Sequence, residues 1–146
     1  MILYHASPDD GIDELIPQKI STPGIEEGTS PARIYAGNDP AYAAAHGFRW
    51  ETKEGFNLGF VLDDTGKEIV KLSVPRHLMH RLDQPVSVYS LPSDDFEVLA
   101  HVNPPGRNFA SSKPVKPIDK KIFPSITSAI EFYGGKVDIY DTPSFP

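Results

Sequence analysis

Three groups of residues in this sequence have types and spacings that suit chemistry. In the first apolar segment, His5 and Ser7 stand two residues apart. Residues two apart on a β-strand share a face, so an imidazole and a hydroxyl there would point the same way and could hold a sugar diol or an amide. The alternative interpretation of His5 is a buried structural histidine bonded to a backbone carbonyl.

A second group lies where a predicted strand turns into a predicted helix. Tyr35 is near the end of the segment Ala32–Ala36, and Gly37 precedes the alanine-rich run Ala41–Ala45. An aromatic ring in that place can stack on a planar ligand, and a glycine lets the ligand approach the backbone because it has no side chain. The alternative interpretation of Tyr35 is a tyrosine of the hydrophobic core.

A third group has the spacing of metal ligands. His77 and His80 are three residues apart, which puts them on one face of a helix, and Asp83 follows. Three such side chains can hold zinc, but a fourth strong ligand is missing and basic residues flank the pair at Arg76 and Arg81. A surface turn is therefore the favoured interpretation.

The first two groups together resemble motifs of the ADP-ribosyltransferase-like superfamily, which includes bacterial toxins, poly-ADP-ribose polymerases and RNA 2′-phosphotransferases. Many small members open with a strand reading Leu-Tyr-His-x-Ser and later carry a strand ending in Tyr-Ala before an alanine-rich helix. Here the matching residues are 3–7 and 35–45. The resemblance touches most of residues 1–118 in short patches and implies that the protein binds NAD as a substrate.

Roles for individual residues follow from this resemblance. It implies that His5 bonds a ribose and the nicotinamide amide with the assistance of Ser7, and that Tyr35 stacks on the nicotinamide ring. Gly37 and Tyr42 complete the set implied to contact the dinucleotide.

The third motif of the family departs from its usual form here. Active transferases usually have a glutamate, sometimes a glutamine, at the start of a late strand, where it bonds the 2′-hydroxyl of the nicotinamide ribose and stabilises the positive charge as nicotinamide leaves. The matching position is Asn108, which carries no charge. Losing a charged group aimed at a developing cation could cost several kcal/mol of transition-state stabilisation. Glu97 and Glu131 are other carboxylates that could take the role.

The resemblance implies an enzyme that transfers ADP-ribose to a macromolecule, a protein in preference to a nucleic acid because the net charge is −6. Two alternatives stay open. One is a catalytically inert binding or structural module, encoded by a phage or another mobile element, which Asn108 supports. The other is an enzyme acting on RNA 2′-phosphate or on a nucleobase. It would need several arginines around the cleft, and those of this chain are scattered, at Arg33, Arg49, Arg76, Arg81 and Arg107.

The elements that must position these residues are short, because 15 of the 146 residues are proline, which lacks a backbone N–H. Helices are predicted over 40–45, 76–82 and 126–133, and extended chain over 115–123. Strands are predicted over 2–7, 32–36, 56–62, 68–74, 86–91, 96–102 and 137–140. The strongest signal is the alternation of Phe56, Leu58 and Phe60, which predicts one buried face of an antiparallel hairpin reaching Val74.

These elements predict one α+β domain over residues 1–146 with mostly antiparallel pairing. The family resemblance implies that the strands form two small sheets flanking a cleft. The loop 18–31 is predicted to lie at the cleft mouth, since long loops beside a site tend to act as lids. No segment approaches the ~20 apolar residues of a membrane span, and residues 1–5 do not resemble a signal peptide. The sequence has no cysteine, and a cytoplasmic protein without a membrane partner is expected.

Overall fold

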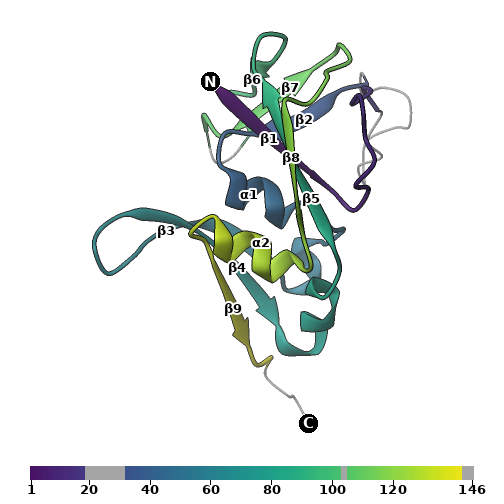
Figure 1. Ribbon diagram of the computed structural model, residues 1–146. Helices are drawn as coiled ribbons and strands as arrows, with labels where there is room; N and C mark the ends of the chain where they lie inside the picture. Colours follow the sequence, from purple (N-terminus) through teal and green to yellow (C-terminus); the bar gives the residue numbers. More distant parts are fainter. Residues whose placement is uncertain (19–31, 103–104, 143–146) are drawn as a thin grey trace.

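Two β-sheets and two short α-helices make up the fold, which is of the predicted α+β class (Figure 1). The computed structural model describes residues 1–18, 32–102 and 105–142. The strands are β1 (Ile2–Ser7), β2 (Ile34–Gly37), β3 (Asn57–Leu62), β4 (Glu68–Pro75), β5 (Val86–Pro92), β6 (Glu97–Val98), β7 (Asn108–Ser111), β8 (Asp119–Phe123) and β9 (Lys136–Tyr140). The α-helices are α1 (Pro40–Ala45) and α2 (Ile126–Phe132), and two 3₁₀ helices span Thr52–Glu54 and Arg76–Leu82.

The larger sheet has the strand order β6–β7–β2–β1–β5–β8, and all of its pairs are antiparallel. Its two faces bury different clusters of side chains. Leu3, Tyr89 and Leu91 belong to the cluster on one face, whereas Val86 and Val88 belong to the cluster that includes the helices and the smaller sheet. Strand β5 is therefore covered on both sides, which explains its continuous run of buried residues.

The pairing between β1 and β2 is much shorter than the pairing between β1 and β5. Strand β1 pairs with β5 along its whole length, from Ile2 to Ser7, but it pairs with β2 only at Tyr4, opposite Gly37. Beyond that point no ladder pair joins the two strands, so the sheet is split between them. This split is the feature of the fold on which the site depends.

Both α-helices lie between the two sheets (Figure 1), and their caps are the ones expected from the sequence. Asp39 accepts hydrogen bonds from the first N–H groups of α1, and Ser125 does the same for α2. The alanines of α1 are buried and bring its backbone close to β1 and α2. A methyl group on Gly47, just after α1, would come within 2.4 Å of Val86 Cγ2, so the chain can leave the helix here only without a side chain.

The smaller sheet has the order β3–β4–β9 and contains the one departure from antiparallel pairing among the described residues. The predicted antiparallel hairpin is confirmed, with Leu58 opposite Leu72 and Phe60 opposite Val70. Its predicted buried face is present only in part: Phe56, just before β3, is buried, whereas Leu58 and Phe60 are half-buried. Strand β9 was expected as a strand, but its parallel pairing with β4 was not. Parallel pairing requires a long crossover, and the chain between β4 and β9 provides one by passing through strands β5–β8 of the larger sheet and through α2.

Two expected elements are shorter than predicted. The segment 96–102 forms a strand only over Glu97–Val98, because the chain turns directly afterwards, with the Val102 N–H donating to the Leu99 carbonyl (3.2 Å). In the segment 115–123 the strand covers Asp119–Phe123, while Val115 forms an isolated bridge with Leu15. The predicted loop 18–31 lies outside the described residues except for Gln18.

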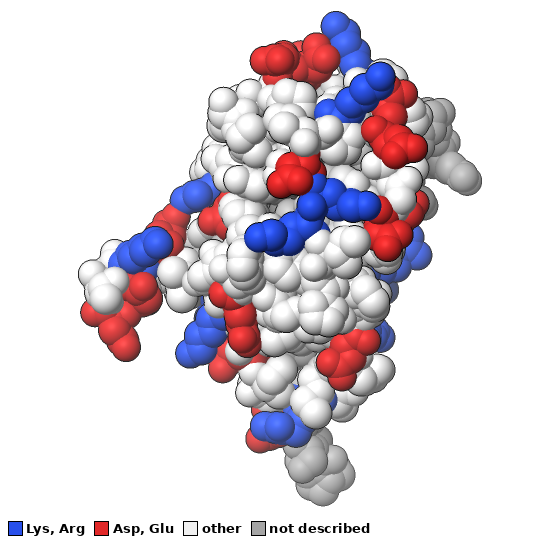
Figure 2. All heavy atoms as spheres, viewed as in Figure 1, with Lys and Arg blue, Asp and Glu red and all other residues white. Residues whose placement is uncertain are grey.

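Charges of both signs are interleaved on the face shown in Figure 2. None of the helices within the described ranges is long and apolar enough to cross a membrane.

Candidate functional site

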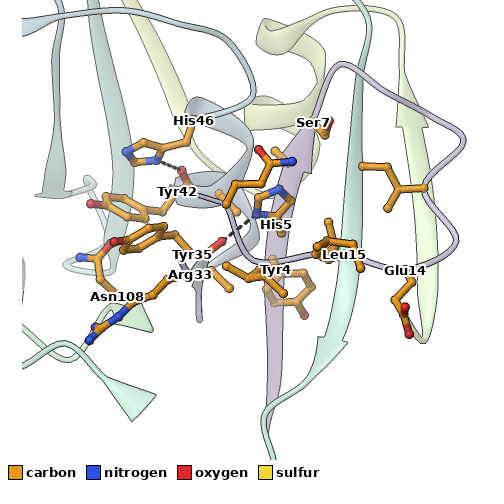
Figure 3. Close-up of a pocket in the computed structure, with 18 residues that line it drawn as sticks. Tyr4, His5, Ser7, Glu14, Leu15, Arg33, Tyr35, Tyr42, His46 and Asn108 are labelled. Atoms are coloured by element: carbon orange, nitrogen blue, oxygen red, sulfur yellow. Dashed lines mark hydrogen bonds between the residues drawn. The ribbon is translucent and has the colours of Figure 1, made fainter. Parts of the chain in front are cut away.

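A pocket of about 500 Å³ opens at the split between β1 and β2 (Figure 3). Residues of β1, β2 and α1 line it, together with the segment that follows β1. All six residues that the sequence singled out for NAD contact or catalysis are among them: His5, Ser7, Tyr35, Gly37, Tyr42 and Asn108.

The side chain of His5 joins β1 to β2 by a hydrogen bond where backbone pairing between the two strands is missing. It lies inside β1 rather than at the strand end, and its Nδ1 is 2.7 Å from the carbonyl oxygen of Tyr35 on β2. A carbonyl can only accept, so Nδ1 carries the hydrogen, and Nε2 of the neutral ring is an acceptor. Burial lowers the pKa of His5 below its usual 6.5, while the hydrogen bond to Tyr35 acts in the opposite direction. His5 thus has the backbone-carbonyl bond expected of a structural histidine, but it is only half-buried, and its second nitrogen stays available.

Tyr35 and Asn108 share one face of the sheet. Residue pairs directly opposite each other point to the same face, and Gly37 is opposite Asn108 while Tyr35 is opposite Ala110. Tyr35 is 38% exposed, so it is not a core tyrosine and its ring can meet a ligand. The amide Nδ2 of Asn108 is buried and has no hydrogen-bond partner among the described residues. A buried amide without a partner is rare in proteins, and Asn108 itself lines the pocket.

Ser7 and Tyr89 fix the chain that forms the opposite wall. The Ser7 hydroxyl oxygen accepts from the N–H of Asp9 at 3.1 Å, so this side chain stabilises the turn after β1. The buried Tyr89, opposite His5 on β5, donates to the Asp9 carbonyl (2.7 Å) and accepts from the Ile12 N–H (3.2 Å). These bonds hold the segment that leads into the pocket wall.

An aromatic row borders the pocket on the side of α1. The rings of Tyr42 and Phe60 are stacked, with centroids 5.5 Å apart. His46 lies 4.8 Å from Tyr42 and 5.8 Å from Trp50. The His46 Nδ1 is 2.9 Å from the Tyr42 carbonyl oxygen, which repeats the arrangement of His5. The protein packed around His46 lowers its pKa below 6.5, although the side chain also meets solvent.

The pocket carries charges of both signs. Glu14 is its one acidic lining residue and Arg33 its one basic lining residue among the described residues. In Figure 3, Arg33 lies on the side of Tyr35 and Asn108, and Glu14 lies on the other side. A dipolar ligand would find partners for both of its ends here.

The remaining sequence candidates do not join this pocket. Glu97 is on β6 and Glu131 is on α2, and neither lines it. The predicted metal ligands His77 and His80 lie on the 3₁₀ helix Arg76–Leu82, and within the described ranges no group of three or more metal-binding side chains is assembled.

Sequence reasoning missed Glu14 and His46 and gave Arg33 no role at this site. The sequence spacing of two of these residues could have indicated their place in the site. Arg33 is two residues before Tyr35, the spacing of one strand face, and His46 is four residues after Tyr42, the spacing of one helix face. Glu14 stands in a segment without periodicity, so no local pattern marks it.

Comparisons with family models, with curated proteins and with solved structures found no match to this chain.

Proposed function

We propose that this protein binds NAD in the pocket between β1 and β2 and transfers ADP-ribose from it to a macromolecular acceptor. The observation that carries the proposal is the convergence of His5, Tyr35 and Asn108 on one pocket from three different strands. The motif resemblance implies these positions, and they are separated by up to about a hundred residues along the chain.

Each part of the pocket has a task in this reaction. The exposed ring of Tyr35 stacks on the nicotinamide ring. His5 Nε2 accepts a hydrogen bond from the carboxamide N–H or from a ribose hydroxyl, and the buried amide of Asn108 donates to a ligand oxygen once its side chain rotates into the pocket. Together these contacts hold the nicotinamide riboside in one orientation, which is the main contribution a protein makes to such a transfer.

The reaction itself requires little acid–base chemistry. The bond between ribose C1′ and the nicotinamide nitrogen breaks, and its electron pair goes to the nicotinamide nitrogen. A nucleophilic oxygen or nitrogen of the acceptor forms the new bond to C1′ and loses its proton. The transition state has positive charge on the ribose, so a nearby negative group would lower its energy.

The inert binding module is the second candidate, and the side chain of Asn108 favours it. Asn108 Oδ1 can accept from a ribose hydroxyl but supplies no negative charge. Glu14 is the only carboxylate among the described lining residues, and it lies across the pocket from Asn108 (Figure 3). A pocket built in this way binds NAD but turns it over slowly.

An enzyme directed at RNA 2′-phosphate is less well supported. Of the five arginines considered, only Arg33 lines the pocket. Three of the others form ion pairs elsewhere, namely Arg76 with Asp141, Arg81 with Glu54 and Arg107 with Glu68. A phosphate ligand would therefore meet a single cation.

The test combines calorimetric titration with NAD and mass spectrometry of released nicotinamide. The transferase predicts both binding and release, and Asn108→Glu should raise release about tenfold or more if the missing charge limits the reaction. Binding without release, unchanged in Asn108→Glu, would instead establish the inert module. Asp64→Asn, a change in the exposed turn between β3 and β4, is the matched control. Absence of NAD binding to the wild-type protein would refute the proposal.

A further inference from the structure

His5 and His46 share an arrangement that the proposed function uses only in part. Each has its Nδ1 against a backbone carbonyl, at 2.7 Å for His5 and 2.9 Å for His46, and each lines the same pocket. Because both carbonyls can only accept, both rings carry their hydrogen on Nδ1 and have a lone pair on Nε2 when neutral. Neither Nε2 makes a hydrogen bond within the part of the chain that the structure describes.

The ring of His46 is held in one orientation although its side chain is exposed to solvent. Its ring lies between Tyr42 and Trp50 and is bonded at Nδ1, so the direction of its Nε2 is set before any ligand arrives. A ligand that donates to such an acceptor binds more tightly, because no side-chain entropy is lost in orienting the imidazole. His5 is set in the same way by its bond to β2.

Both imidazoles are neutral at physiological pH, because the protein packed around each ring lowers its pKa below 6.5, although His46 is also exposed to solvent. The other titratable and charged side chains that face them across the pocket come from β1, the segment after β1, the chain leading into β2, β2 itself and α1. They are Tyr4, Glu14, Arg33, Tyr35 and Tyr42. Glu14 is the one group in this set whose charge favours protonation of the histidines.

We propose that His5 and His46 form a pair of hydrogen-bond acceptors that makes the pocket selective for ligands donating at two points, so that it binds the carboxamide form of a pyridine dinucleotide and rejects the carboxylate form. This inference rests on the proposed function and specifies its substrate. In NAD the donors are the carboxamide N–H groups and the ribose hydroxyls. In the deamidated dinucleotide a carboxylate replaces the carboxamide, has no hydrogen to donate and turns negative charge towards two lone pairs.

Arg33 acts against this selectivity, because its positive charge attracts a carboxylate. Glu14 acts in favour of it by repelling one. A bare difference in affinity between the two dinucleotides therefore mixes three effects, and variants of the histidines are needed to isolate the acceptors. An asparagine places its amide NH₂ near the position of a histidine Nδ1–H. His5→Asn and His46→Asn thus keep the bond to the backbone carbonyl and remove Nε2, while the amide oxygen falls near the position of the ring Cδ2.

The experiment is calorimetric titration of the wild-type protein with NAD and with its deamidated form at about pH 7.5, where the imidazoles are neutral. We expect the carboxylate form to bind about tenfold more weakly or worse, since it loses at least one hydrogen bond and leaves an acceptor unpaired. His5→Asn and His46→Asn should each weaken NAD binding and reduce the ratio between the two ligands. His77→Asn, on the 3₁₀ helix outside the pocket, should leave both values unchanged.

A second set of titrations, with the pH lowered in steps from about 7.5 until the imidazoles take up protons, tests the wild-type protein without any substitution. The dinucleotide carboxylate stays ionised there because the adjacent pyridinium charge lowers its pKa. Protonation converts each Nε2 from an acceptor to a donor, so the ratio should move towards the carboxylate form. A ratio between the two dinucleotides that His5→Asn and His46→Asn both leave unchanged would overturn the acceptor pair and leave NAD binding intact. If neither dinucleotide binds, the proposed function and this inference fail together.

Discussion

Removing one hydroxyl group, in Tyr89→Phe, tests whether the wall of the pocket is held as described. Tyr89 is 1% exposed and its hydroxyl makes two hydrogen bonds to the segment after β1, one to the Asp9 carbonyl and one from the Ile12 N–H. Each such bond contributes about 0.5–1.5 kcal/mol, and a partner left buried without a bond costs more. Asp9 is exposed, so its carbonyl can turn to water, whereas Ile12 is half-buried. We therefore expect a loss of about 1–2 kcal/mol in the free energy of unfolding.

Urea denaturation measures this loss as a lower transition midpoint at an unchanged m-value, because the surface exposed on unfolding stays the same. The variant should also bind NAD more weakly, since the loosened segment leads into the wall formed by Glu14 and Leu15. Tyr140→Phe is the matched control: its hydroxyl donates to the Gly55 carbonyl, away from the pocket. That variant should lose stability and keep its affinity. A stability change in Tyr89→Phe below about 0.5 kcal/mol, or equal NAD affinities in the two variants, would refute the reasoning.

Three further predictions concern the core, the ligand and the pH dependence. Gly47→Ala should cost about 1–3 kcal/mol of stability in the same urea assay, because the added methyl group meets Val86 Cγ2 at 2.4 Å. Tyr35→Ala should weaken NAD binding by about 1 kcal/mol in calorimetry and change stability little, since the ring is 38% exposed. Stability should fall as the pH drops below 6.5, because the unfolded chain binds protons at His5 and His46 more readily than the folded one. The urea midpoint should fall less steeply with decreasing pH in the double variant His5→Asn/His46→Asn than in the wild-type protein.

The sequence predicts those parts of the fold whose signals are local. The hairpin of β3 and β4 follows from the alternation of Phe56, Leu58 and Phe60, and the start of α1 follows from Asp39 before a proline. Both signals lie within a few residues of the structure that they specify. The pairing of β1 between β5 and β2 has no such signal, because tertiary packing alone decides which distant strands meet.

The same distinction applies to the candidate site. The motif residues of β1 and β2 were found from their sequence phrases, and the structure brings them to one pocket. The split that creates this pocket exists because the pairing of β1 with β2 stops after Tyr4. No property of the residues that follow Tyr4 in the sequence indicates that the pairing ends there. His46 was overlooked because it follows a run of alanines and looks like the end of a helix, where it does serve as the C-cap.

The parallel pairing of β4 with β9 also has a consequence for how the chain folds. The hairpin of β3 and β4 can form as soon as its own residues are available, but its third strand comes from residues 136–140, more than sixty positions later. Contacts between such distant segments form slowly because a long loop must first be closed. Until then one edge of β4 stays unpaired, and its apolar residues Val70, Leu72 and Val74 are open to association with other chains. Refolding yield should therefore fall as protein concentration rises, and the smaller sheet should be the last part of the molecule to gain protection from hydrogen exchange.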